Sequence, residues 1–283
     1  EMSASLVGSE MCIRDRTKAV RLYGKEDLRL EEFDLPEMKE DEILAHIISD
    51  SVCMSTYKAM EQGSDHKRVP KDIDRNPVIV GHEFCGEIVK VGSKWQHKFK
   101  PGQKFSIQPA MNYKGSLYAP GYSYRWIGGN SQFVVIPHEV MECDCLLHYD
   151  HDAYFYGSLA EPVSCIVGGY HCNYHATPGV YVHNMGIVEG GNTILMAAAG
   201  PMGLEAIDYA IHCDRKPGLL VVTDIDSVRL KRAASIHTVE EAEKNGVKLV
   251  YVNTNDVENA HDYLMELTGG KGYDDAFVYA PVK

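Results

Sequence analysis

The sequence predicts an α/β chain in which a β-rich unit precedes part of a doubly wound parallel sheet. Between residues 17 and 137, short alternating hydrophobic runs are broken by Gly and Pro, a pattern typical of antiparallel strands. After Gly190, strands alternate with helical segments, which favours parallel βαβ units. The 283 residues are 45% hydrophobic and 24% charged, which is enough for packed cores in about two domains.

The composition also excludes several classes of protein. The formal net charge of −12 argues against nucleic acid as the main partner. There is no run of 18 apolar residues, so we expect no membrane span. Eight irregularly spaced cysteines are too few for a disulfide scaffold and suit reduced thiols in a cytoplasmic protein, some of which could bind metal.

The first sixteen residues read EMSASLVGSEMCIRDR, and residues 6–16 resemble a translated sequencing adapter. We therefore interpret residues 1–16 as a non-native leader; the alternative is a native polar tail. The leader carries a charge of −1, so the remainder carries −11. A native start near Thr17 fits because TKAVRLYG predicts a strand followed by a turn.

The second part of the chain has the order strand, glycine turn, helix, strand. The segment NTILMAAAG predicts a strand, and Leu204, Ile207 and Ile211 then fall on one face of a helix. Three further segments predict strands: GLLVVTDID, KLVYVN and DDAFVYA. This alternation predicts a parallel sheet with helices packed against it.

The segment AAGPMG is the dinucleotide pattern G-x-G-x-x-G with Ala198 in place of its first glycine. Gly200 would let the backbone approach a pyrophosphate, and Gly203 would let the helix pack closely on the strand. Pro201 and Met202 begin that helix, whose free N–H groups would face the phosphates. Alanine disfavours a positive φ, so this turn is expected to be less tight than usual. A glycine turn that binds no nucleotide is the alternative.

Asp224 ends the next predicted strand, 21 residues after Gly203. A carboxylate there can bind both ribose hydroxyls and would repel a 2′-phosphate, so NAD is favoured over NADP. Arg229 nearby would soften this preference, and a solvated strand end is the alternative for Asp224. A dinucleotide-binding sheet of this kind has six strands, whereas the chain ends after the fourth, so we expect a C-terminally truncated sheet.

A second motif lies in the first part of the chain. Residues 81–92 read GHEFCGEIVKVG, Cys53 lies upstream, and GGNSQFVVIP and the glycine pattern follow. In this order the motifs resemble the zinc-dependent medium-chain dehydrogenase family, which contains alcohol and sorbitol dehydrogenases. The resemblance implies a GroES-like catalytic domain over residues 17–166 and a partial, C-terminally truncated Rossmann domain over residues 167–283.

The resemblance also implies a zinc site. Cys53, His82 and Glu161 match the family's ligands, and such a set with one open position suits catalytic Zn²⁺. Glu83 matches a carboxylate that lies near the metal or binds it, and Ser55 matches the hydroxyl that relays the substrate proton. The structural alternatives are a buried thiol at Cys53, a structural His82, a helix cap at Glu161 and a turn serine at Ser55.

Many members of the family carry four clustered cysteines for a second zinc, but the matching stretch PAMNYKGSLYAPGYSYRW has none. We therefore expect no structural zinc and expect Cys143 and Cys145 to pack or face solvent. Aromatic rings in this stretch suit a sugar face, and Arg125 suits a phosphate; an exposed lobe of mixed packing is the alternative. The rings belong to Tyr113, Tyr118, Tyr122, Tyr124 and Trp126.

The segments HCNYHATPGVYVHNMGIVEGGN and VVTDIDSVRLKRAA resemble the L-sorbose 1-phosphate reductase-like branch of the family. We therefore expect zinc-dependent hydride transfer between NAD(H) and a polyol, sugar or sugar phosphate, with L-sorbose 1-phosphate as one candidate substrate. The expected site is the cleft between the domains, and the complete protein is expected to be a homo-oligomer. The alternatives are a zinc-free oxidoreductase of the quinone-reductase type, a non-catalytic NAD-binding module and a fragment without activity.

Overall fold

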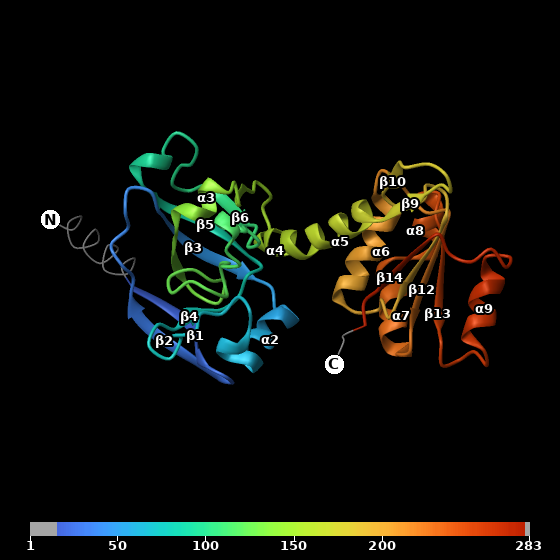
Figure 1. The fold of residues 1–283 in the computed structure, drawn as a ribbon, viewed down its shortest axis with the longest axis horizontal. Coiled ribbons are helices and arrows are strands. Elements are labelled where there is room, and N and C mark those ends of the chain that lie inside the picture. The colour runs from blue at the N-terminus through green and yellow to red at the C-terminus, as the bar shows by residue number, and fades with distance from the viewer. Residues whose placement is uncertain (1–15, 281–283) are drawn as a thin grey trace. The chain divides into compact units, whose positions relative to one another are not determined.

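The computed structural model of the chain describes residues 16–280, which form two units (Figure 1). The first unit ends at Glu161 and the second begins at Pro162. The predicted leader lies outside the described residues except for Arg16, which begins strand β1. The predicted domain boundary after residue 166 falls inside helix α5 (Ala160–Cys172).

The first unit contains two antiparallel sheets, with strand orders β2–β1–β4 and β7–β3–β5–β6–β8. Its strands are β1 (Arg16–Gly24), β2 (Asp27–Asp34), β3 (Ile43–Asp50), β4 (Val78–Ile79), β5 (Phe84–Val91), β6 (Lys104–Ile107), β7 (Phe133–Ile136) and β8 (Leu146–His148). Its helices are α2 (Met54–Gln62), α3 (His138–Glu142) and α4 (Tyr154–Ser158), with short 3₁₀ turns η1 (Gly63–Asp65), η2 (Ser93–Trp95) and η3 (Tyr113–Gly115). The β-rich prediction for this part of the chain is confirmed.

Two hydrophobic cores hold the first unit together. In β3, Ile43, Ala45 and Ile47 point inward at every second position, as a half-buried strand requires, and pack on side chains from β5 and β7. A smaller core lies beneath α2, where Ala59 packs with side chains from β1 and from the segment that contains Val69. This second core supports the residues of the candidate site.

The second unit contains a four-stranded parallel sheet of order β13–β12–β11–β14. Its strands are β11 (Asn192–Met196), β12 (Leu219–Asp224), β13 (Lys248–Asn253) and β14 (Asp275–Val278), and β9 (Tyr174–Ala176) pairs with β10 (His183–Met185) in a separate hairpin. Besides α5, its helices are α6 (Pro201–His212), α7 (Ser227–Ile236), α8 (Val239–Lys244) and α9 (Ala260–Leu267). The predicted parallel, doubly wound sheet is confirmed.

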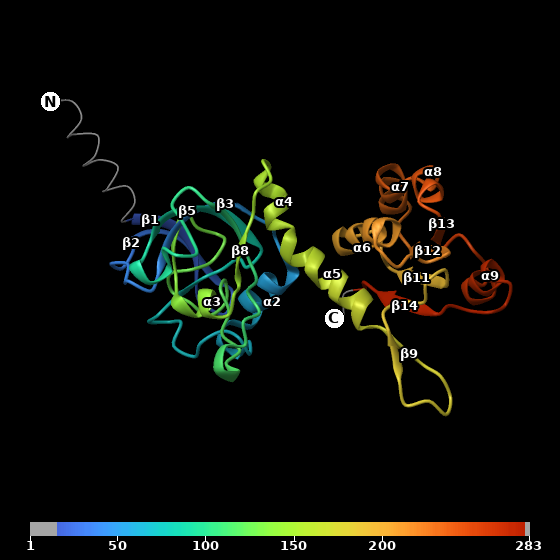
Figure 2. The ribbon, with the colours of Figure 1, turned by 90° about the horizontal axis from the view of Figure 1, so that it is seen from above.

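Helices cover both faces of this sheet (Figure 2). Leu195 and Leu220 belong to a core that α5, α6, α7 and α8 complete on one face. Ile194 and Val221, their chain neighbours, belong to a core on the other face that includes Leu264 of α9. Because consecutive strand residues point to opposite faces, strands covered on both sides are apolar throughout, as β12 is.

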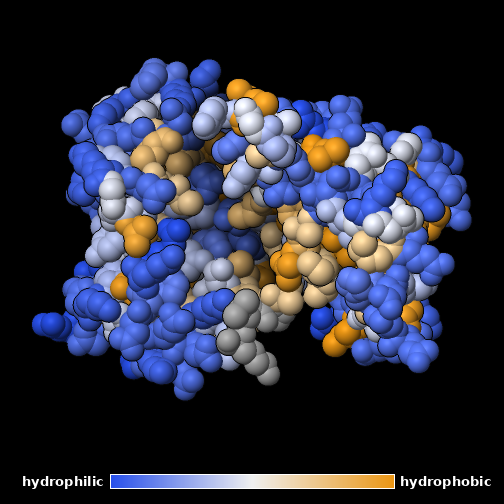
Figure 3. Space-filling view, turned by 45° about the vertical axis from the view of Figure 1, so that its right-hand side comes forward, coloured by the Kyte–Doolittle hydropathy of each residue, from blue (hydrophilic) through white to orange (hydrophobic). Residues whose placement is uncertain are grey.

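Most of the face drawn in Figure 3 is hydrophilic, in keeping with a chain that is 24% charged. Among residues 16–280, no helix has both the length and the apolar character needed to cross a membrane.

His237, which follows α7, is buried and gives the second unit an expected pH dependence. Burial lowers its pKa, although Asp208 and Glu241 act in the opposite direction. The unfolded chain takes up a proton near pH 6.5, and the native state takes it up only at lower pH. The free energy of unfolding should therefore fall as the pH falls below about 6.5.

Urea unfolding of the protein and of His237→Gln at pH 7.5 and pH 5.5 measures this effect. The substitution should reduce the loss of stability between the two pH values, whereas His261→Gln, at an exposed position, should not. Equal pH dependence in the protein and in His237→Gln would contradict the assignment.

Candidate functional site

The antiparallel pairing of β3 with β5 explains why Cys53 and His82 lie close together. Asp50, the last residue of β3, is paired with Phe84, the first residue of β5. Cys53 follows β3 by three residues, and His82 and Glu83 directly precede Phe84. Two segments that are 29 residues apart in sequence therefore meet at one end of the five-stranded sheet.

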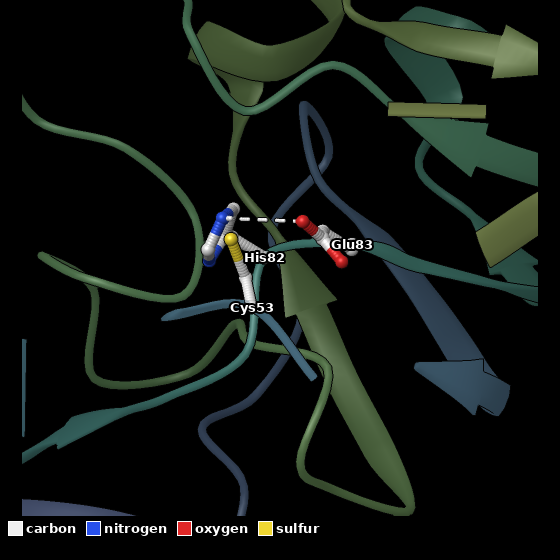
Figure 4. Close-up of side chains that lie close together, drawn as sticks. All are labelled: Cys53, His82 and Glu83. Carbon is white, nitrogen blue, oxygen red and sulfur yellow. Dashed lines mark ion pairs between the residues drawn. The ribbon is translucent and has the colours of Figure 1, made fainter. Parts of the chain in front are cut away.

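Cys53, His82 and Glu83 form a cluster of possible metal ligands (Figure 4). One ligand atom from each residue lies within 4.8 Å of the others, and His82 Nε2 is 3.9 Å from Glu83 Oε1. His82 and Glu83 are buried, and Cys53 is partly exposed. Ligand atoms around tetrahedral zinc lie about 3.5 Å apart, so a small contraction would make this donor set fit Zn²⁺.

Two hydroxyl groups orient the imidazole of His82. Thr56 Oγ1 lies 3.2 Å from Nδ1, and the Tyr122 hydroxyl lies 3.1 Å from Nε2. The ring of Tyr122 also packs against the imidazole, with 4.6 Å between centroids. A histidine that ligates a metal typically donates its other N–H to such a partner, which fixes the tautomer. With Nδ1 donating to Thr56, the lone pair on Nε2 accepts from the Tyr122 hydroxyl, a position that a metal ion bound at Nε2 would take.

The start of helix α2 carries three residues of the candidate site. Cys53 is its N-cap residue, with φ −93° and ψ 141°, and Ser55 and Thr56 lie in its first turn. The packing of Ala59 in the core beneath α2 fixes this helix relative to the segment that carries His82.

Burial controls the charge states in the cluster. It lowers the pKa of His82 to about 4, and the positive charge of Arg68 acts in the same direction. It raises the pKa of the Cys53 thiol to about 11, although hydrogen bonding to Ser55 acts in the opposite direction. A neutral imidazole is the form that binds metal, and a coordinated cation would deprotonate the thiol.

Ser55 and Glu161 share a pocket of about 270 Å³ with His82 and Tyr122. Burial raises the pKa of Glu161 to about 7, with the negative charge of Glu83 acting in the same direction and Arg68 against it. Although Glu161 lines the pocket, it is not part of the cluster formed by Cys53, His82 and Glu83. The remaining lining residues are His66, Lys67, Arg68, Pro109, Ala110 and Ala119.

Asp50 holds the backbone that carries the cluster. Its carboxylate accepts a hydrogen bond from the Glu83 N–H (3.2 Å) and another from the Asn130 amide group. Gly81 has φ +92°, and a Cβ there would lie 2.2 Å from Asp50 Oδ2, so only glycine fits. The sequence analysis did not identify Asp50 or Thr56, although a polar residue at the end of a mostly apolar strand is a usable signal.

The predicted glycine pattern lies between β11 and α6. A Cβ at Gly203 would lie 1.9 Å from the Ala198 carbonyl oxygen, so the close approach of helix and strand requires glycine here. A Cβ at Gly200 would meet no protein atom within 4 Å. Glycine at position 200 is therefore not needed for packing, and it leaves the start of α6 open to a ligand. Pro201 is the first residue of α6, and Met202 packs partly against the core.

The turn before α6 contains a left-handed residue, Ala197, with φ +54°. Ala198, where alanine was expected to disfavour a positive φ, does not have one. The N–H of Ala198 donates to the carbonyl of Thr223 on the neighbouring strand, which keeps Ala198 in line with the sheet.

Asp224 is buried at the end of β12 and accepts three backbone hydrogen bonds. The donors are the N–H groups of Ala199 (3.1 Å), Ile225 (2.8 Å) and Asp226 (3.1 Å). A carboxylate has about four acceptor positions, so roughly one remains for a further donor. Arg229 is exposed and forms an ion pair with Asp226 at 3.5 Å.

The aromatic side chains of residues 113–126 have different surroundings. Of these rings, Tyr122 lines the pocket, whereas Tyr113 and Tyr124 pack against the main core of the first unit. Arg125 lies over Trp126, with its guanidinium carbon 4.8 Å from a ring centroid, and is absent from the pocket lining. Outside this stretch, Cys145 is buried in the main core and Cys143 packs against it.

The chain is similar in sequence to known dehydrogenases and reductases. The Alcohol dehydrogenase GroES-like domain family matches residues 39–146. The chain is 50% identical over 265 residues to L-sorbose 1-phosphate reductase of Klebsiella pneumoniae and 49% identical over 267 residues to mannitol-1-phosphate 5-dehydrogenase of Aliivibrio fischeri. Each match covers 94% of this chain and 63% of the relative, so the chain spans less than two thirds of their length.

Among solved structures, the chain resembles 2R,3R-butanediol dehydrogenase from Bacillus subtilis with a TM-score of 0.68. The match covers 94% of this chain and 71% of that structure. At 21% sequence identity, this similarity supports the fold.

Proposed function

We propose that this chain, which belongs to the medium-chain dehydrogenase/reductase family close to its L-sorbose 1-phosphate reductase branch, is a zinc-dependent oxidoreductase. It would transfer a hydride between NAD(H) and the carbonyl–alcohol pair of a polyol, sugar or sugar phosphate. The observation that carries the proposal is the convergence of Cys53, His82 and Glu83 within 4.8 Å, beside a pocket lined by Ser55 and Glu161.

The proposed zinc ligands are Cys53, His82 and Glu161, with Glu83 beside them. A thiolate, a neutral imidazole and a carboxylate suit Zn²⁺ and leave one position for a substrate oxygen. Zinc, when bound there, supplies Lewis acidity toward that oxygen. The chemistry of the donor set and the burial of His82 support this assignment.

The protein's own groups would orient the site and move the proton. Thr56 holds the tautomer of His82 that directs Nε2 toward the cluster. NADH, when bound, would supply the hydride to the substrate carbon, and a group of the protein would have to supply the proton that the substrate oxygen needs. Ser55 lines the pocket and hydrogen-bonds to Tyr122, so we assign the relay of this proton to Ser55.

The nucleotide would bind at the start of α6 in the second unit. Gly200 leaves room for a pyrophosphate, and the N–H groups of Met202 and Gly203 lie in the first turn of the helix, before the first helical hydrogen bond from Leu204 N–H to the Gly200 carbonyl. The remaining acceptor position of Asp224 suits a ribose hydroxyl and would repel a 2′-phosphate, so we assign NAD before NADP. Arg229 is already paired with Asp226, which limits its use for a 2′-phosphate.

The substrate class rests on the relatives. One is a reductase named for L-sorbose 1-phosphate and another a dehydrogenase named for mannitol 1-phosphate, so hexitol and ketose phosphates are the first substrates to test. The homo-oligomeric state expected for the complete protein remains a prediction. No observation favours the quinone-reductase-type or non-catalytic alternatives, and both are outcomes of the test below.

Elemental analysis, cofactor binding and turnover of hexitol phosphates test the proposal together. We expect one zinc per chain and NADH binding at least about tenfold tighter than NADPH. Glu161→Gln should weaken zinc binding and lower kcat/KM by about 100-fold, since the ligand charge is lost. Glu142→Gln, which alters an exposed carboxylate paired with Lys94, should change neither.

Three results would contradict the proposal, each in a different way. Turnover without zinc would point to the quinone-reductase type. Binding of NADH without turnover of any polyol or sugar phosphate would point to a non-catalytic module. Full zinc content in Glu161→Gln would remove Glu161 from the ligand set.

A further inference from the structure

The pocket that contains the candidate metal ligands has a basic wall. It consists of three consecutive residues, His66, Lys67 and Arg68. The proposed metal chemistry does not require basic residues at these positions. Two of the three, Lys67 and Arg68, are cations, and burial together with these two charges lowers the pKa of His66.

Residues 66–68, which form this basic wall, are held in place by contacts with the rest of the first unit. Val69, the next residue, is buried in the core beneath α2. The carbonyl of Arg68 accepts a hydrogen bond of 2.6 Å from Ser123 Oγ, and Arg68 Nη1 donates to the carbonyl of Leu117 at 3.2 Å. The N–H of Arg68 donates to His66 Nδ1 at 3.3 Å. These contacts preorganise the segment, which lowers the entropic cost of binding a ligand there.

One aromatic ring connects the basic wall to the candidate metal ligands. Tyr122 stacks on His66, with 5.6 Å between centroids and 10° between the planes. The guanidinium carbon of Arg68 lies 5.8 Å from the centroid of the same ring. The Tyr122 hydroxyl lies 3.1 Å from His82 Nε2. Tyr122 therefore contacts His66 and Arg68 as well as His82, one of the proposed metal ligands.

We propose that His66, Lys67 and Arg68 form the subsite for the phosphate group of a phosphorylated sugar or polyol. This inference rests on the proposed function, because it assigns the substrate class of the same pocket. An arginine can bind phosphate through two parallel hydrogen bonds, and a lysine adds a mobile positive charge. Lys67 is exposed and Arg68 is partly buried, so both can present donors to a ligand.

The charges of the pocket lining also favour an anionic ligand. Lys67 and Arg68 bring two positive charges to the lining, which they share with Glu161. A neutral polyol has no charge with which to compensate them. A phosphate dianion would compensate both cations when it binds.

The size of the pocket agrees with a small phosphorylated substrate. At about 270 Å³, it is slightly below the usual range for ligand pockets. Arg125, the arginine that the sequence pattern suggested for phosphate, lies over Trp126 and outside this lining. The phosphate subsite is therefore assigned to a different segment of the chain from the one suggested by the aromatic stretch.

Steady-state kinetics with mannitol 1-phosphate and with mannitol tests the subsite. We expect Lys67→Ala and Arg68→Gln each to lower kcat/KM for mannitol 1-phosphate by about 10- to 100-fold. In Lys67→Ala the value for mannitol should change by less than about twofold, and Arg68→Lys should recover part of the loss seen in Arg68→Gln. Arg75→Ala, an exposed arginine a few residues later, and Arg125→Gln are controls that should leave the ratio of the two substrates unchanged.

Direct binding separates this inference from the proposed function. Inorganic phosphate should bind the protein and compete with mannitol 1-phosphate, and Lys67→Ala, at an exposed position, should weaken its binding without loss of folding. If phosphate binding depends on Lys67 and Arg68 but the protein has no dehydrogenase activity, the subsite stands and the proposed function is refuted. The subsite is refuted if the protein is active but the variants have no effect, or if they lower kcat/KM equally for both substrates. A preference of the active protein for a sugar acid would also refute it.

Discussion

Replacing Cys53 with alanine is expected to abolish zinc binding and to lower kcat/KM by about 10²- to 10⁴-fold. The thiol is one of the three candidate ligands, and its ligand atom lies within 4.8 Å of those of His82 and Glu83. Lewis acidity toward the substrate oxygen contributes several kcal/mol to transition-state stabilisation, and each 1.36 kcal/mol corresponds to a factor of ten in rate. NADH binding should be unchanged, because the glycine pattern belongs to the second unit.

A matched control separates loss of a ligand from loss of a buried thiol. Cys145 is buried in the main core of the first unit, more deeply than Cys53, so Cys145→Ala removes a packed thiol but no candidate ligand. Both variants are measured for zinc per chain, thermal unfolding and turnover. Zinc retained at one atom per chain in folded Cys53→Ala would refute the proposed metal centre.

Alanine at Gly203 is expected to destabilise the second unit by about 3 kcal/mol, whereas alanine at Gly200 should leave its stability nearly unchanged. At Gly203 the new Cβ would lie 1.9 Å from the oxygen and 2.4 Å from the carbonyl carbon of Ala198, both backbone atoms that cannot rotate away. Helix α6 would have to move from β11, and overpacking of this kind costs about 1–3 kcal/mol or more. At Gly200 the Cβ meets no atom within 4 Å, and φ is −87°, an ordinary value for alanine.

The same pair of variants tests the nucleotide site. If Gly200 leaves room for a pyrophosphate, Gly200→Ala should weaken NADH binding by about tenfold or more while the protein stays folded. Urea unfolding and NADH fluorescence titration of the two variants give the two quantities. Unchanged NADH affinity in Gly200→Ala would place the dinucleotide elsewhere, and unchanged stability in Gly203→Ala would contradict the packing argument.

Regular patterns made much of the fold predictable. The predicted strand KLVYVN coincides with β13, Lys248–Asn253, because its four central residues are apolar and Gly246 and the polar segment after Asn253 bound it. The glycine at position 203 was predicted for the packing role that the structure gives it. The position of the left-handed residue was not predicted, because the conformation of the turn depends on the hydrogen bond between Ala198 and Thr223, which are far apart in sequence.

The candidate site was predictable only where local motifs mark it. The resemblance to a known family led to Cys53, His82 and Glu83, and the structure places them together. Asp50 and Thr56 were missed because their roles depend on the β3–β5 register and on the direction of α2.

The basic wall was missed for a similar reason. In sequence it is a short charged run, and such runs are most often solvated. Only the folding of residues 66–68 onto Tyr122 brings them into the pocket, and no periodicity or spacing in the sequence marks that contact.

The first turn of α2 carries a candidate ligand, the candidate proton relay and the hydroxyl that orients the histidine, at Cys53, Ser55 and Thr56. These groups share one backbone, so a shift of the helix displaces all of them at once. Double-mutant cycles among the three positions should therefore be strongly non-additive, with two substitutions together costing little more than one. A change at Ala59, on the buried face of α2, should alter metal affinity, proton transfer and histidine orientation together.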